Sequence, residues 1–204
     1  MKEADLLFPA TAMPDRDWWR ALWPDPQGVL RALGLDAGLT VVDLCCGDGY
    51  FTAPLAALTQ GKVFAIDLDP AMLDKAKAEV DRVGATQPQW ICADARDLAE
   101  RVVEKADFVL IANTFHGVPD KTGLIGAAAT VLKPGGRLAI VNWHRLAREK
   151  TVVLDQARGP ASEMRMSPEQ VREVVEPAGF ELSRIVQLPP YHYGAIFRTA
   201  GTGT

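Results

Sequence analysis

The chain has 204 residues, a length suited to one hydrophobic core of ordinary size, and 48% of them are hydrophobic and 24% charged. These values exclude a disordered or fibrous chain. The formal net charge is −4 and the Lys and Arg residues are scattered among acids, so no basic stripe for nucleic acid is visible. No apolar run approaches the ~18–20 residues that span a bilayer, which predicts no membrane span.

The N-terminus and the cysteines predict a cytoplasmic protein. Residues 1–5 are acidic and lack the basic start and apolar stretch of a signal peptide. Cys45, Cys46 and Cys92 form no spaced framework, which is typical of a reducing compartment. Neither these cysteines nor the three histidines show ligand-like spacing, so we expect no metal.

From residue 40 onward, apolar runs alternate with helix-forming stretches. The strands are expected at 40–44, 62–66, 89–92, 107–112 and 137–142, and the helices at 51–58, 70–83, 94–104 and 121–132. Near-continuous apolar strands in a β-α-β rhythm predict a parallel sheet that is covered on both faces.

The C-terminal part departs from this rhythm. Ser167 is expected to cap a helix, with Gln170 as its capping-box partner. Strand-like runs at 180–188 and 191–197, separated by two prolines, predict an antiparallel hairpin. We therefore expect one domain, with a core over 36–198, a helical N-terminal flap over 1–35 and a frayed tail over 199–204.

The turn after the first predicted strand carries the most information. It has the pattern Asp-x-Cys-x-Gly-x-Gly, from Asp43 through Cys45 and Gly47 to Gly49. Its glycines let backbone approach a ligand closely, and the following helix points free N–H groups at the same place. A dinucleotide site needs G-x-G-x-x-G, and the spacing fails because Tyr50 follows Gly49.

This turn resembles motif I of the class I S-adenosylmethionine-dependent methyltransferases, Asp-x-Gly-x-Gly-x-Gly. Cys45 stands at the first Gly, where the backbone then has less freedom. Further matches follow in the family's order over roughly residues 35–198. They are Ala65-Ile66-Asp67, Asp69-Pro70-Ala71-Met72-Leu73, Ala93-Asp94-Ala95, the stretch from Asn113 to Asp120, and Leu132-Lys133-Pro134-Gly135-Gly136-Arg137-Leu138.

The resemblance implies a Rossmann-like, seven-stranded, mostly parallel sheet of order 3-2-1-4-5-7-6, with the last strand antiparallel and helices on both faces. It also implies S-adenosylmethionine as cofactor and S-adenosylhomocysteine as product. The ribose hydroxyls would bind Asp67, the ammonium end Asp43, and adenine Met72 and Asp94. The whole cofactor set implied is Asp43, Cys45, Gly47, Gly49, Asp67, Leu68, Met72, Asp94, Ala95 and Asn113.

Each assignment has a simpler structural alternative. Asp67 could be a solvated acid at a strand end, and Asp94 could only cap a helix. His116 is a candidate general base, because imidazole titrates near neutrality, but it could equally support its loop.

Aromatic residues supply the candidates for the acceptor site, which are Trp18, Trp19, Trp143 and Tyr191. Trp19 and Trp23 share a helix face, so the tryptophans could instead pin the flap to the core. We expect residues 10–30 to become ordered when the cofactor binds, with Trp18 or Trp19 near the site.

The predicted function is methyl transfer to a small-molecule acceptor by direct in-line displacement, in a monomer or homodimer that binds no nucleic acid. Two alternatives stay open: an NAD(P)-dependent oxidoreductase, and a non-catalytic protein that binds S-adenosylmethionine.

Overall fold

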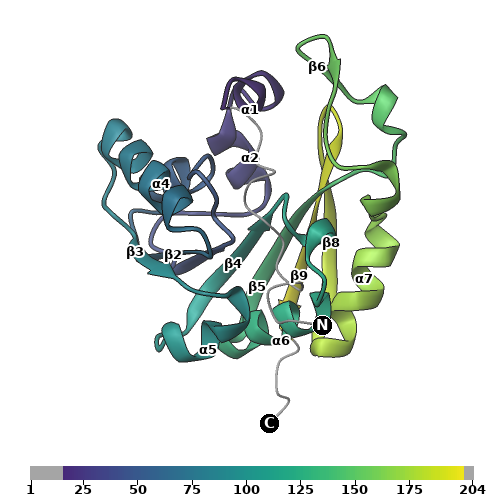
Figure 1. The fold of residues 1–204 in the computed structure, drawn as a ribbon. Coiled ribbons are helices and arrows are strands. Elements are labelled where there is room, and N and C mark those ends of the chain that lie inside the picture. The colour runs from purple at the N-terminus through teal and green to yellow at the C-terminus, as the bar shows by residue number, and fades with distance from the viewer. Residues whose placement is uncertain (1–15, 200–204) are drawn as a thin grey trace.

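The computed structural model describes residues 16–199, and a seven-stranded sheet organises this part of the chain (Figure 1). Residues 1–15 of the expected flap and 200–204 of the expected tail lie outside it, and Thr199 ends the last strand. The strands of the sheet are β1 Val41–Leu44, β2 Val63–Asp67, β3 Gln89–Cys92, β4 Ala106–Ala112, β5 Leu132–Trp143, β8 Phe180–Leu188 and β9 His192–Thr199.

The sheet has the order β3-β2-β1-β4-β5-β9-β8, which confirms the predicted order and fold class. The labels differ because a two-stranded hairpin, β6 Val152–Val153 with β7 Gln156–Ala157, precedes β8. Strands β1 to β5 pair in parallel, and β9 pairs antiparallel with both β5 and β8. The carboxyl ends of the five parallel strands therefore share one edge.

Alternate residues of the buried strands face two hydrophobic layers. Val42, Leu44 and Val109 pack with α5, α6 and α7, whereas Val41 and Leu110 pack with α1, α2 and α3. This alternation is the period-two pattern of a strand that is covered on both faces. The helices are α1 Arg16–Leu22, α2 Pro26–Ala32, α3 Thr52–Thr59, α4 Pro70–Val83, α5 Leu98–Arg101, α6 Lys121–Val131 and α7 Pro168–Val175.

Short 3₁₀ turns connect several of these elements, at Ala95–Asp97, Phe115–Gly117, Arg148–Lys150, Ser162–Met164 and Glu176–Ala178. The helix expected over 94–104 is wrong in extent, because it is split into the turn Ala95–Asp97 and the single turn of α5. The Asp94 side chain accepts from the Arg96 N–H, which tightens the start, and Val102 is already extended.

Helix starts follow local sequence closely. Helix α4 has the expected bounds, with Asp69 accepting from the Ala71 N–H ahead of Pro70. The predicted capping box of α7 is confirmed, since Ser167 and Gln170 each accept from the other's backbone N–H. In the described range, no helix is long and apolar enough to cross a bilayer.

The segment after β5 contains the hairpin β6–β7. Its turn places Leu154 and Asp155 at φ 50° and 59°. Such two-residue turns favour Gly, Asn and Asp, so Asp155 is typical of one but Leu154 is not, and the pair did not indicate a hairpin. In Figure 1 this hairpin and α1 both lie beyond the carboxyl ends of the parallel strands, and the two elements contact each other.

Candidate active site

The turn after β1 adopts the conformation that its glycines predict. Gly47 and Gly49 have φ values of 56° and 80°. Cys45 also lies in the left-handed region, at φ 62°, although it has a Cβ. Cysteine therefore adopts the left-handed conformation at the position of the motif's first glycine.

Gly49 serves packing between the turn and α4. A Cβ on Gly49 would lie 2.7 Å from the Ala76 Cα, which real side chains do not tolerate. Its missing side chain thus lets α4 approach the turn. Gly49 does not line the cavity described below, whereas Gly47 does.

Asp67, at the end of β2, ties the two neighbouring strand ends together. Its Oδ2 accepts from the Gly47 N–H at 2.7 Å and its Oδ1 from the Asp69 N–H at 3.0 Å. Burial raises the pKa of this carboxyl above its usual value, although these N–H donors oppose the shift. Asp67 is thus a buried acid held by backbone donors, and the solvated alternative is excluded.

Asp43, in β1, is almost fully buried. Its Oδ2 accepts a hydrogen bond from the Thr52 hydroxyl at 2.6 Å. Burial is the main reason that the pKa of Asp43 is raised to about 7, and the nearby Asp67 adds to the shift. A positive charge beside these two carboxyls would favour their ionised forms.

Asp94 caps the turn that follows β3, which agrees with the alternative interpretation of this residue as a helix cap. Its carboxylate accepts from the Arg96 N–H at 2.9 Å and pairs with the Arg96 guanidinium at 2.6 Å. The Arg96 side chain lowers the pKa of Asp94. Because Asp94 also lines the cavity, capping does not exclude a contact with a ligand.

The loop after β4 contributes Asn113 and His116. Asn113 lies at φ 59°, and within residues 16–199 no group donates to its buried Oδ1. The His116 Nδ1 lies 3.1 Å from the Asn142 Oδ1. Burial lowers the pKa of His116 to about 4, so its imidazole is neutral at physiological pH and a weak base.

Tryptophans form a stacked wall across α1 and β5. The Trp18 ring lies 4.9 Å from Trp19 and 6.0 Å from Trp143, and Trp19 stacks on Trp23 at 5.5 Å as their shared helix face predicted. All four are buried in the core. The tryptophans of α1 therefore do pin this helix to the core.

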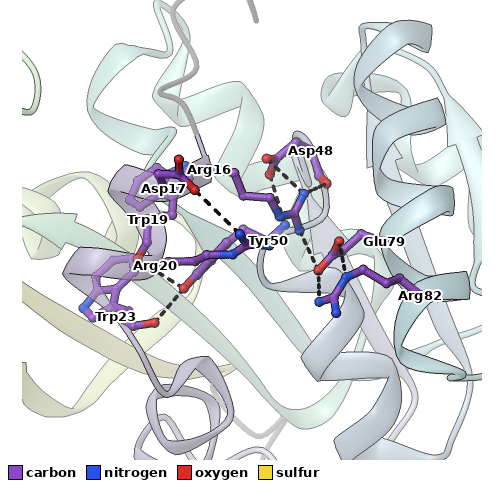
Figure 2. A network of polar contacts seen from close by, with 9 residues as sticks. All are labelled: Arg16, Asp17, Trp19, Arg20, Trp23, Asp48, Tyr50, Glu79 and Arg82. Atoms are coloured by element: carbon purple, nitrogen blue, oxygen red, sulfur yellow. Dashed lines mark hydrogen bonds and ion pairs between the residues drawn. The ribbon is translucent and has the colours of Figure 1, made fainter.

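Polar contacts fix α1 over the turn after β1 (Figure 2). Arg16 pairs with Asp48 at 3.3 Å and with Glu79 of α4 at 3.1 Å. The Tyr50 hydroxyl donates to the carbonyl oxygens of Trp19 and Trp23, at 3.1 and 2.6 Å. Helix α1 is thus attached both to the turn and to α4.

A cavity of about 500 Å³ opens between the strand ends, α1 and the segment after β5. This volume is within the range of small-molecule sites. Twelve of the fifteen residues predicted from sequence line it: Trp18, Trp19, Asp43, Cys45, Gly47, Asp67, Leu68, Asp94, Ala95, Asn113, His116 and Trp143.

Three predicted site residues lie elsewhere. Gly49 packs on α4, and Met72 is buried on α4 without lining the cavity. Tyr191 stacks at 6.2 Å on Trp143, and its hydroxyl exchanges hydrogen bonds with the backbone of Val152 at 2.9 and 3.2 Å. Tyr191 therefore holds β6 rather than facing the cavity.

Sequence reasoning missed one wall of the cavity, which comes from the segment after β5 and includes Arg148, Arg158, Gly159, Pro160 and Met164. The organiser of this segment is Arg165, which is 1% exposed. Its guanidinium donates to the carbonyl oxygens of Leu146, Arg158 and Pro160 and to the Thr151 hydroxyl, at 3.0–3.1 Å.

No spacing pattern in the sequence indicates these contacts, because Arg165 joins groups 5–19 residues away in the chain.

A cluster of metal-binding side chains is absent from the described part of the chain. Across residues 16–199, no group of three or more His, Cys, Asp and Glu side chains could hold a metal, and the three cysteines are free.

Comparison with known proteins identifies the class of this chain. Residues 41–136 match the family described as "Methyltransferase domain". A SAM-dependent methyltransferase from Aquifex aeolicus shares the fold with a TM-score of 0.76 and 25% identity, over 94% of this chain and 97% of that one. The chain belongs to the class I S-adenosylmethionine-dependent methyltransferases, whose cofactor is S-adenosylmethionine.

Two curated relatives are similar to part of the chain. A ubiquinone biosynthesis O-methyltransferase from Xanthomonas oryzae pv. oryzae is 32% identical over 137 residues, 63% of this chain and 56% of that protein. A demethylmenaquinone methyltransferase from Lactococcus lactis subsp. lactis is 31% identical over 141 residues, 67% of this chain and 52% of that protein. The chain thus spans about half the length of these relatives.

Proposed function

We propose that this protein transfers a methyl group from S-adenosylmethionine to a small aromatic molecule. The observation that carries the proposal is one cavity that combines buried acids from two strand ends with a tryptophan wall. The acids suit a cationic cofactor with ribose hydroxyls, and the tryptophans suit an apolar, planar acceptor.

The residues of the cavity fit the cofactor. Asp43 and Asp67 are buried acids that form no ion pair among the described residues, burial raises the pKa of both, and the Asn113 Oδ1 lacks a donor in the same part of the chain. We assign the ammonium end to Asp43 and the ribose to Asp67. Leu68, Asp94 and the other lining residues of the predicted set would complete the cofactor site.

When bound, S-adenosylmethionine would supply an electrophilic methyl group on a positively charged sulfur. The acceptor's lone pair would form the new bond to the methyl carbon, and the electrons of the broken carbon–sulfur bond would stay on sulfur. The chain's own residues then need only position the acceptor and exclude water, which can lower the barrier by roughly 7–11 kcal/mol in good cases. Trp18, Trp19 and Trp143 are placed to do both.

His116 is better suited to support than to proton transfer. Its low pKa makes it a weak base, and its contact with Asn142 links the loop after β4 to β5. We propose that it shapes the acceptor side of the cavity, and that the acceptor's proton leaves to water.

Two features guide the choice of acceptor and setting. The relatives named above are a ubiquinone biosynthesis O-methyltransferase and a demethylmenaquinone methyltransferase, and these names favour a small aromatic acceptor. We propose that the protein works in the cytoplasm, as a monomer or homodimer that binds no nucleic acid, with the free cysteines of its described part suited to a reducing compartment.

Ligand titration tests the proposal. S-adenosylmethionine and S-adenosylhomocysteine should raise the melting temperature and NAD(H) should not, because binding at a hundredfold excess over Kd stabilises the fold by about 2.7 kcal/mol. A response to NAD(P)H with none to S-adenosylhomocysteine would favour the oxidoreductase. Binding without any labelled product, from methyl-labelled cofactor and a panel of phenols and catechols, would favour a non-catalytic role.

A further inference from the structure

The wall of the cavity formed after β5 is cationic. Arg148 and Arg158 both line the cavity. Residues 144–166 contain five Lys and Arg and three Asp and Glu, a net charge of +2 in a chain whose net charge is −4. Within residues 16–199, no carboxylate lies within ion-pair distance of Arg148 or Arg158. The other charged residues that line the cavity are either acidic or, like Arg96, paired with an acid.

Arg158 is held in place by its backbone. Its carbonyl oxygen accepts from the Thr151 hydroxyl at 2.7 Å and from the buried Arg165 guanidinium at 3.1 Å. Its guanidinium lies 5.9 Å from the ring of Trp18, at the tryptophan wall. In the described part of the chain, nothing accepts from its buried Nε.

Arg148 stands beside it on the same segment. Its Nε donates to the carbonyl oxygen of Gly159 at 3.1 Å, and its N–H donates to the Ser162 hydroxyl at 3.0 Å. A buried guanidinium donor without an acceptor costs free energy, and an Arg fork matches a carboxylate with two parallel hydrogen bonds. A ligand that brings an anionic group would remove this cost.

The sheet order separates this cationic wall from the acids. Asp43 and Asp67 come from β1 and β2, whereas Arg158 follows β5, and β4 lies between β1 and β5. Neighbouring strands are about 4.8 Å apart, so β1 and β5 are roughly 10 Å apart. The cavity thus has an acidic side for a cationic cofactor and a basic side next to Trp143.

We propose that the methyl acceptor is an aromatic carboxylate, with its ring against Trp143 and Trp18 and its carboxylate bound by Arg158 with help from Arg148. This inference rests on the proposed function and adds the chemical class of the acceptor. The cofactor's own carboxylate has the same chemistry, so the experiment must separate the two.

The test uses the full-length protein and a panel of small aromatic acids, hydroxylated benzoates and cinnamates, each paired with its neutral amide. Affinities are measured by calorimetry with the protein saturated in S-adenosylhomocysteine, and for S-adenosylhomocysteine alone. At least one acid should bind ten times more tightly than its amide. Arg158→Gln should abolish this preference, Arg158→Lys should keep part of it, and both should bind S-adenosylhomocysteine as the wild type does.

Arg145→Gln is the matched control, since Arg145 is exposed on the same segment and does not line the cavity. It should keep the full preference for the acid. The proposal is overturned if no acid of the panel is preferred over its amide, including the case where none binds. It is also overturned if Arg158→Gln weakens S-adenosylhomocysteine tenfold, because Arg158 would then serve the cofactor. Failure of the wild type to bind S-adenosylhomocysteine would instead count against the proposed function.

Discussion

At the scale of single residues, one carboxylate performs two tasks. Asp67 accepts from the backbone N–H groups of Gly47 and Asp69 and also lines the cavity. The same side chain therefore shapes the turn after β1 and offers lone pairs to a ligand, since each carboxylate oxygen can accept more than one hydrogen bond. Loss of this residue should affect binding and folding to different degrees.

We predict that Asp67→Ala weakens S-adenosylhomocysteine binding more than it weakens the fold. Two ribose hydroxyls lose a charged acceptor worth roughly 1.5–3 kcal/mol each, so affinity should fall at least tenfold. The loss of the bonds to Gly47 and Asp69 should lower the free energy of unfolding by about 1–3 kcal/mol. Calorimetry and urea unfolding measure the two effects.

Asp74→Ala is the control for this variant, because Asp74 is exposed on α4 and pairs only with Lys77 among the described residues. It should change neither the affinity nor, by more than about 0.5 kcal/mol, the stability. An Asp67→Ala protein that binds S-adenosylhomocysteine as tightly as the wild type would show that the ribose assignment is wrong.

At the scale of elements, α1 combines two properties. It is attached to the body by the Arg16 ion pairs and by the Tyr50 hydroxyl, yet Trp18 and Trp19 line the cavity. A helix of seven residues has little stability of its own, so its order depends on these contacts. A ligand that covers the tryptophans would add to them.

We predict that S-adenosylhomocysteine slows amide hydrogen exchange in Arg16–Leu22 at least twofold. Arg16→Gln should exchange faster than the wild type without ligand, because the pairs to Asp48 and Glu79 are lost, and should still be protected by the ligand. Strong protection of equal size with and without ligand would mean that the tryptophans serve core packing alone. Residues 10–15 of the expected flap lie outside the described structure.

At the scale of the whole molecule, buried histidines and a buried aspartate change the stability of the fold in opposite directions when the pH falls. Burial lowers the pKa of His116 to about 4 and that of His192 well below its usual value. The unfolded chain therefore takes up protons at both imidazoles below about pH 6.5 and the folded chain does not, so acid weakens the fold. Burial raises the pKa of Asp43 to about 7, so folded Asp43 takes up a proton in this range and acid strengthens the fold there.

We predict that Asp43→Asn makes stability fall more steeply with acid. Asn keeps an oxygen for the Thr52 hydroxyl but cannot take up the proton. Between about pH 6.5 and 4.5, the free energy of unfolding of the variant should therefore fall by about 1.4 kcal/mol per pH unit more than that of the wild type. Urea unfolding across this range measures both slopes. Parallel slopes would show that Asp43 has an ordinary pKa in the folded protein.

The sequence by itself determined the class of fold and most of the residues that line the cavity at the ends of β1, β2 and β4. Strand and helix periods, the capping signals at Asp69 and Ser167, and the glycine turn all act within a few residues of one another. Once the carboxyl ends of parallel strands share an edge, residues such as Asp43, Asp67 and Asn113 must come together there. The positions of these residues at the ends of predicted strands were therefore sufficient to predict that they lie together.

Only the tertiary structure decided the cationic wall, the unusual pKa values and the function of Tyr191 and Gly49. The turn at Leu154 and Asp155 lacks the glycine pair that would indicate a hairpin, and Arg165 orders the segment through bonds to carbonyl oxygens that any sequence offers. Burial, which raises the pKa of Asp43, results from the packing of several distant elements. These features depend on contacts between residues that are distant in the sequence, so no local pattern predicts them and they form only in the folded structure.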